Sequence, residues 1–93
     1  MKFRTCFVSN SSSESFVVFR KGLTKSQCRR IVNAHDMAPR LYPELSHVDC
    51  IEDWIITDKG REIRLYTSMN NFDMREYLQK LGLQEDVHFK ATN

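Results

Sequence analysis

The sequence predicts a single α+β domain over residues 1–93, in which two helices cover one face of a mainly antiparallel sheet in the order ββαββαβ. A chain of 93 residues, 41% hydrophobic and 28% charged, has the composition of a globular protein with one modest core. Short runs of β-branched and aromatic residues predict the strands. Two segments with capping residues and helical spacing of apolar residues predict the helices.

The first two predicted strands, residues 3–8 and 16–20, flank a serine-rich loop. The loop runs from Ser9 to Ser15, and five of its seven residues are serine. Segment 16–20 is apolar on both faces, so we expect it at the centre of the sheet. A link of this length is longer than a tight hairpin turn, which favours a functional or a mobile loop.

The first predicted helix begins at Thr24, which forms a capping box with Gln27. Its expected end is at residues 36–38, because Pro39 disfavours helical geometry in the residue before it. The residues that recur at helical spacing and are expected to face the sheet are Cys28, Ile31, Val32 and His35.

The second half of the chain predicts a hairpin, a helix and a last strand. Residues 54–57 and 61–67 alternate as strands around a turn that contains Gly60. Asn70 is the expected cap of the second helix, and Gly82 its expected end. Residues 87–91 are predicted to form an edge strand. The apolar stripe of the second helix is Met74, Tyr77, Leu78 and Leu81.

The run RTCFVSNSSSESF from Arg4 to Phe16 resembles an N-terminal signature, roughly R-x-G-F-V-S-N-S-S-S-S-S-F, of small uncharacterised proteins from tailed bacteriophages and some bacteria. The stretch YTSMNNFDM from Tyr66 to Met74 is similar to a phrase in such proteins. Cys6 stands where glycine is usual, and Glu14 interrupts the serine run. The resemblance implies a phage accessory protein and supplies neither an activity nor catalytic residues.

The serine-rich loop is the first candidate site, for a partner protein or a small ligand. Its hydroxyls and backbone amides suit a phosphate group, but the loop has no glycine and Glu14 would repel an anion. Contact with a protein partner and a plain connecting turn are the alternatives. The candidate residues are Ser9, Asn10, Ser11, Ser12, Ser13, Glu14 and Ser15.

A second candidate site is the basic face of the first predicted helix, which continues a basic stretch begun by Arg20 and Lys21. Cations on one helical face can contact nucleic-acid phosphates, and the alternative is a solubilising surface. The formal net charge of +2 is too small to favour nucleic acid by itself. The candidate residues are Lys21, Lys25, Arg29 and Arg30.

Metal and cysteine chemistry are weaker hypotheses. Asp49, Glu52 and Asp53 are oxygen donors of the kind that Mg²⁺ or Mn²⁺ prefers, but their spacing also fits a solvated acidic loop. The three cysteines form no C-x-x-C pair, so buried free thiols are expected. No cofactor and no catalytic constellation are predicted.

These patterns favour a non-enzymatic phage-type accessory protein that acts by protein–protein interaction, in host takeover or inhibition of a host factor. The alternative is a nucleic-acid-binding protein, and a small metal-dependent hydrolase or nuclease is less favoured. No membrane partner is expected, because the longest apolar runs are far shorter than the ~20 residues of a membrane span. The expected location is the cytoplasm, which is that of the host cell if a phage encodes the protein. The oligomeric state is left open, a homo-oligomer included.

Overall fold

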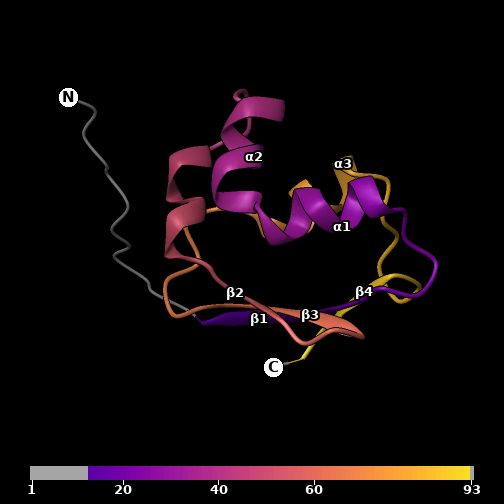
Figure 1. Cartoon of the computed structure of the whole chain (residues 1–93). Helices are drawn as coiled ribbons and strands as arrows, with labels where there is room; N and C mark the ends of the chain where they lie inside the picture. The colour runs from indigo at the N-terminus through magenta and orange to yellow at the C-terminus, as the bar shows by residue number, and fades with distance from the viewer. Residues whose placement is uncertain (1–12, 93) are drawn as a thin grey trace.

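The computed structural model describes residues 13–92 and has two layers, with the helices on one face of a sheet (Figure 1). It confirms the predicted α+β class and its antiparallel sheet. In chain order the elements are β1 (Glu14–Phe19), α1 (Lys25–Val32), α2 (Ala34–Leu41), the 3-10 helix η1 (Val48–Asp53), β2 (Ile55–Asp58), β3 (Glu62–Thr67), α3 (Met74–Lys80) and β4 (Phe89–Ala91). The predicted strand 3–8 lies outside the described residues.

The four described strands form an antiparallel sheet in the order β2-β3-β1-β4. β1 lies inside the sheet as predicted, between β3 and β4, and begins at Glu14 rather than at Phe16. In the register of β1 and β3, Phe16 is paired with Leu65 and Phe19 with Glu62. The end of β1 therefore lies beside the turn that joins β2 to β3.

The core fills the space between the sheet and the helices, and Trp54 lies in it. The Trp54 indole stacks on the Phe16 ring with centroids 5.9 Å apart. The Phe89 ring packs edge-on against the Phe16 ring with centroids 5.8 Å apart. The indole N–H donates a hydrogen bond of 3.1 Å to the carbonyl of Phe72, so burial leaves no unmet donor on this side chain. Ile63 and Leu65 of β3 are fully buried, which confirms the predicted alternation.

The first helical segment differs from the prediction, because it forms two helices that meet at Asn33. The capping box of Thr24 and Gln27 is present, but α1 ends when the Asn33 side chain and backbone N–H both bond to the Arg29 carbonyl. α2 then continues through Pro39, although proline lacks an N–H for one backbone hydrogen bond and its ring crowds the carbonyl four residues earlier. Residues 13–92 thus contain three α-helices, whereas the sequence predicts two.

His35 was predicted to lie in the core and is instead exposed, near the start of α2. Its Nε2 lies 2.6 Å from the Trp54 carbonyl oxygen. The break at Asn33 rotates the chain, so Ala34 and Ala38 take the buried positions. Their small side chains allow α2 to approach the core closely.

α3 has the predicted apolar stripe and a different cap. Asp73 caps it by accepting the backbone N–H of Glu76 at 3.1 Å, whereas the predicted cap, Asn70, donates to the Glu14 carboxylate at 2.9 Å. The helix ends as predicted at Gly82, which has φ of 95°. The N–H of Leu83 bonds back to the Leu78 carbonyl at 3.1 Å, the signature of a Schellman ending.

The cysteines follow the prediction only in part. Cys28 is a free and buried thiol. Cys50 is buried but disulfide-bonded, which corrects the expectation of a free thiol there. Cys6 lies outside the described residues.

Candidate functional site

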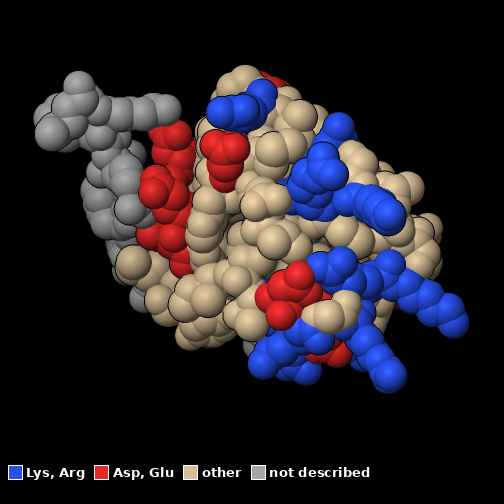
Figure 2. Space-filling view, viewed as in Figure 1, with Lys and Arg blue, Asp and Glu red and all other residues tan. Residues whose placement is uncertain are grey.

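Lysine and arginine side chains gather on the side of the molecule that carries α1 and the turn between β2 and β3 (Figure 2). Acidic side chains gather on the opposite side of the same view, over η1, the element that carries three acidic residues. We call the first region the basic surface. Its members are Arg20, Lys25 and Arg29, which line one pocket, Lys59 and Arg61, which line a second one, and the exposed Lys21, which follows Arg20 in the chain.

Two stretches that are distant in sequence, residues 20–29 and 59–61, form this surface because of the β1–β3 pairing. The backbone N–H of Arg20 bonds to the Arg61 carbonyl at 3.1 Å, which fastens the end of β1 to the turn. The capping box starts α1 soon after β1 ends, and Lys25 and Arg29 lie four residues apart on one helical face. The sheet register and the helix start therefore determine where these cations lie.

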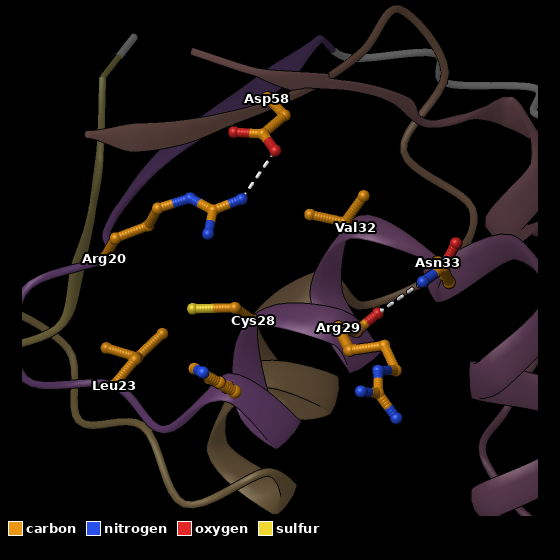
Figure 3. A pocket seen from close by; sticks show the side chains of 8 residues that line it. Arg20, Leu23, Cys28, Arg29, Val32, Asn33 and Asp58 are labelled. Carbon is orange, nitrogen blue, oxygen red and sulfur yellow. Dashed lines mark hydrogen bonds and ion pairs between the residues drawn. The ribbon is translucent and has the colours of Figure 1, made fainter. Parts of the chain in front are cut away.

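A pocket of about 420 Å³ lies within the basic surface, between α1 and β2 (Figure 3). The residues that line it are Arg20, Leu23, Lys25, Cys28, Arg29, Val32, Asn33 and Asp58. The Arg20 guanidinium reaches from the end of β1 toward Asp58, and the Cys28 thiol points from α1 into the space between Arg20 and Leu23. The pocket therefore combines a cationic side with an apolar wall.

Asp58 holds Arg20 in this orientation. Its Oδ2 accepts a hydrogen bond of 2.5 Å from Arg20 Nη2, and its Oδ1 accepts the backbone N–H of Gly60 at 2.9 Å. These donors, the Gly60 N–H first and then Arg20, hold the pKa of Asp58 below its usual range despite some desolvation. Asp58 is therefore a carboxylate at neutral pH.

The Arg20 guanidinium retains hydrogen-bonding capacity after it binds Asp58. Its Nε is buried and has no hydrogen-bond partner in the part of the chain that the structure describes. Since a buried donor without a partner is costly, this atom marks a place where an acceptor from a ligand would be stabilised.

The structure brings together three of the four cations predicted for nucleic-acid contact. Lys21, Lys25 and Arg29 belong to the basic surface. Arg30 lies elsewhere: it is half-buried next to α3, and its carbonyl accepts a 2.6 Å hydrogen bond from Tyr77. The turn of 100° per residue in a helix separates Arg30 from the face of Lys25 and Arg29.

Only the end of the serine-rich loop is described. Residues 9–12 lie outside the described part of the chain, and Ser13 is exposed. Glu14 and Ser15 belong to β1 rather than to a loop. Glu14 accepts a hydrogen bond from Asn70, and the Ser15 hydroxyl lies 2.7 Å from that of Thr92.

The acidic residues Asp49, Glu52 and Asp53 lie on η1. Within residues 13–92 no three histidine, cysteine or acidic side chains are grouped so that they could hold a metal ion.

Sequence reasoning missed the contribution of the β2–β3 turn, namely Asp58, Lys59 and Arg61. The signal available was a turn that carries two cations. It could not be assigned to the site without knowing that β1 pairs with β3, which is a contact between distant segments.

Comparisons of the chain with protein-family models, with curated proteins and with solved structures find no match. No helix of the described region is long and apolar enough to cross a bilayer.

Proposed function

We propose that the protein binds nucleic acid through its basic surface. The observation that carries the proposal is the gathering of six cations, from residues 20–29 and from the β2–β3 turn, on one side of the molecule, with Asp58 and Glu62 as carboxylates among them. Phosphate contacts of this kind position a protein on a strand without reading its sequence. The expected cytoplasmic location would give such a surface access to nucleic acid.

The cations of the basic surface are available for a ligand. Arg20 is paired with Asp58, while the other five have no ion pair within residues 13–92. Lys25, Arg29, Lys59 and Arg61 are also exposed. Binding of a phosphate backbone to these five cations therefore requires no existing salt bridge to be broken. The electrostatic attraction is not reduced by the free-energy cost of such a break.

The test is binding of labelled single-stranded and duplex DNA at low salt, measured by fluorescence anisotropy. The double variant Lys59→Gln/Arg61→Gln removes two cations of the basic surface, and we expect affinity to fall about tenfold or more. The matched control, Arg40→Gln/Lys80→Gln, removes the same total charge from α2 and α3, where these side chains pair with Asp36 and Glu44. An equal loss in both variants, or no binding by the wild-type protein, contradicts the proposal.

A second candidate function is contact with a host or phage protein, as the resemblance of the N-terminal segment to phage accessory proteins implies. The observation in its favour is an exposed apolar pair on the sheet face away from the helices. Ile55 is 60% exposed and Tyr66 44% exposed, and the two are cross-strand partners. Tyr66 also pairs with Ser15, so this pair adjoins the end of the serine-rich loop.

Affinity purification from infected cells tests this second candidate. We compare the wild-type protein with Ile55→Lys and with Thr57→Lys, an exposed position two residues along the same strand. A partner lost with Ile55→Lys and retained with Thr57→Lys supports the apolar pair as the contact. A partner that all three proteins recover equally shows that the contact lies elsewhere.

A further inference from the structure

The pocket between α1 and β2 differs from a second hollow of the basic surface, lined by Lys59, Arg61, Glu62 and Arg64, because it has an apolar wall. A phosphate backbone that runs over a flat basic surface contacts it from outside. The pocket instead offers a depression of about 420 Å³ that is open to solvent on one side, within the range of roughly 300–1,000 Å³ found for small-molecule sites. It can therefore receive a group that projects from a strand or is free.

Charge indicates which kind of group the pocket suits. Arg20, Lys25 and Arg29 line it with one carboxylate, Asp58, so the lining has two positive charges in excess. A phosphate monoester carries about −1.5 to −2 charges at neutral pH and has three free oxygens. An internal phosphodiester carries one charge, so the monoester neutralises this lining more completely.

The donors of Arg20 suit the same ligand. Nη2 is bound to Asp58, while the buried Nε has no partner within residues 13–92. Nε and the terminal nitrogen that does not bind Asp58, Nη1, point to different sides of the guanidinium, so each can donate one hydrogen bond to a phosphate oxygen. Asp58 fixes the guanidinium, so less conformational freedom is lost when the ligand binds.

The apolar wall indicates what the phosphate is attached to. Leu23 and Val32 are half-buried and Cys28 is buried, and all three line the pocket. A phosphate ion alone would leave this wall in contact with water. A sugar or base attached to the phosphate would cover it, which is favourable in proportion to the apolar area removed from water.

We propose that the pocket between α1 and β2 binds the phosphate monoester of a nucleotide, with Arg20, Lys25 and Arg29 on the phosphate and Leu23, Cys28 and Val32 against the nucleoside. The nucleotide is either the phosphorylated end of a strand or a free mononucleotide. The first source rests on the nucleic-acid binding proposed above, and the second does not.

The first experiment compares a single-stranded oligonucleotide of about ten nucleotides with and without a 5′-phosphate, in wild-type protein, Arg20→Gln and Lys59→Gln/Arg61→Gln. We expect the phosphate to raise wild-type affinity about tenfold, in line with charge-assisted hydrogen bonds. Arg20→Gln should abolish the gain in affinity from the 5′-phosphate. Lys59→Gln/Arg61→Gln should weaken the binding of both oligonucleotides but leave that gain unchanged. Arg29→Gln, at an exposed position, provides the same test if Arg20→Gln does not fold.

The second experiment uses Cys28 as a reporter inside the pocket. Alkylation of Cys28 by iodoacetamide is followed by peptide mass spectrometry with adenosine monophosphate, with adenosine, or with neither. We expect the monophosphate to slow the alkylation of Cys28 several-fold and adenosine to leave it unchanged. The Cys28→Ser variant identifies signal from other residues.

The outcomes separate the two sources and the two proposals. A higher affinity for the 5′-phosphorylated oligonucleotide supports a strand end as the ligand of the pocket. Slower alkylation of Cys28 with adenosine monophosphate supports a free nucleotide as the ligand. Protection without any oligonucleotide binding refutes the nucleic-acid function and leaves the pocket assignment standing. Oligonucleotide binding with no effect of a 5′-phosphate and no change in Cys28 alkylation refutes the pocket assignment alone.

Discussion

Raising the salt concentration is the most direct perturbation of a phosphate contact, because binding of protein cations releases counterions from the nucleic acid. Five cations of the basic surface have no ion pair within residues 13–92, namely Lys21, Lys25, Arg29, Lys59 and Arg61. If each contacts one phosphate, a plot of log affinity against log salt has a slope of about −4.5 for duplex and about −3.5 for single strands. Between 50 and 200 mM salt the affinity should then fall roughly 500-fold for duplex and roughly 130-fold for single strands.

Anisotropy titrations at four or more salt concentrations measure these slopes directly. The variant Lys59→Gln/Arg61→Gln removes two of the five cations, so its slope should be shallower than that of the wild-type protein by about 1.8 for duplex and about 1.4 for single strands. The control Arg40→Gln/Lys80→Gln should keep the wild-type slope. A wild-type slope shallower than about −1 would refute the reasoning, because it would mean that no more than one phosphate is neutralised.

Two further predictions concern stability. Thr67 is fully buried, and its hydroxyl accepts the Met69 N–H at 3.2 Å and lies within hydrogen-bonding distance of the carbonyls of Asp53 and Met69. Thr67→Val should lower the free energy of unfolding by about 1–3 kcal/mol, and the melting temperature by about 4–8 °C for each kcal/mol, whereas Thr57→Val on the exposed face of β2 should change little. Burial raises the pKa of Tyr77, so its stabilising contribution is present below the ordinary tyrosine pKa near 10 and is lost as pH rises through the higher folded-state value. Urea unfolding from pH 8 to pH 11 should show this loss in the wild-type protein and a weaker loss in Tyr77→Phe; identical pH profiles would contradict the assignment.

The features predicted correctly from the sequence depend on residues close together in the chain. The capping box needs only Thr24 and Gln27, three residues apart, and the end of α3 needs only Gly82 and the residues around it. The hairpin of β2 and β3 follows from alternation and one turn glycine, Gly60. These interactions join residues that are close together in the chain, so a local pattern is sufficient to predict them.

The errors arise where a distant contact overrides a local preference. Asparagine is a common residue at helix N-caps, but the Asn70 side chain binds Glu14 of β1, and Asp73 caps α3 instead. His35 was placed in the core by helical spacing from Cys28. That spacing holds only for an unbroken helix, and the break at Asn33 puts Ala34 and Ala38 inside.

The candidate site shows the same limit. Lys21, Lys25 and Arg29 are close in sequence and were predicted together. Lys59 and Arg61 join them only because β1 runs antiparallel to β3 in a register that sets Phe19 opposite Glu62. The pocket needs both this register and the start of α1, so no single stretch of sequence carries its signature.

The separation of charge explains why a small net charge does not weaken the case for a phosphate ligand. The Debye length is about 10 Å at 0.1 M ionic strength, while the molecule extends over 37 × 28 × 20 Å. A ligand at the basic surface is therefore largely screened from the acidic residues of η1 on the opposite side (Figure 2). It is attracted by the local cations rather than by the formal charge of +2, so the composition alone underestimates the attraction.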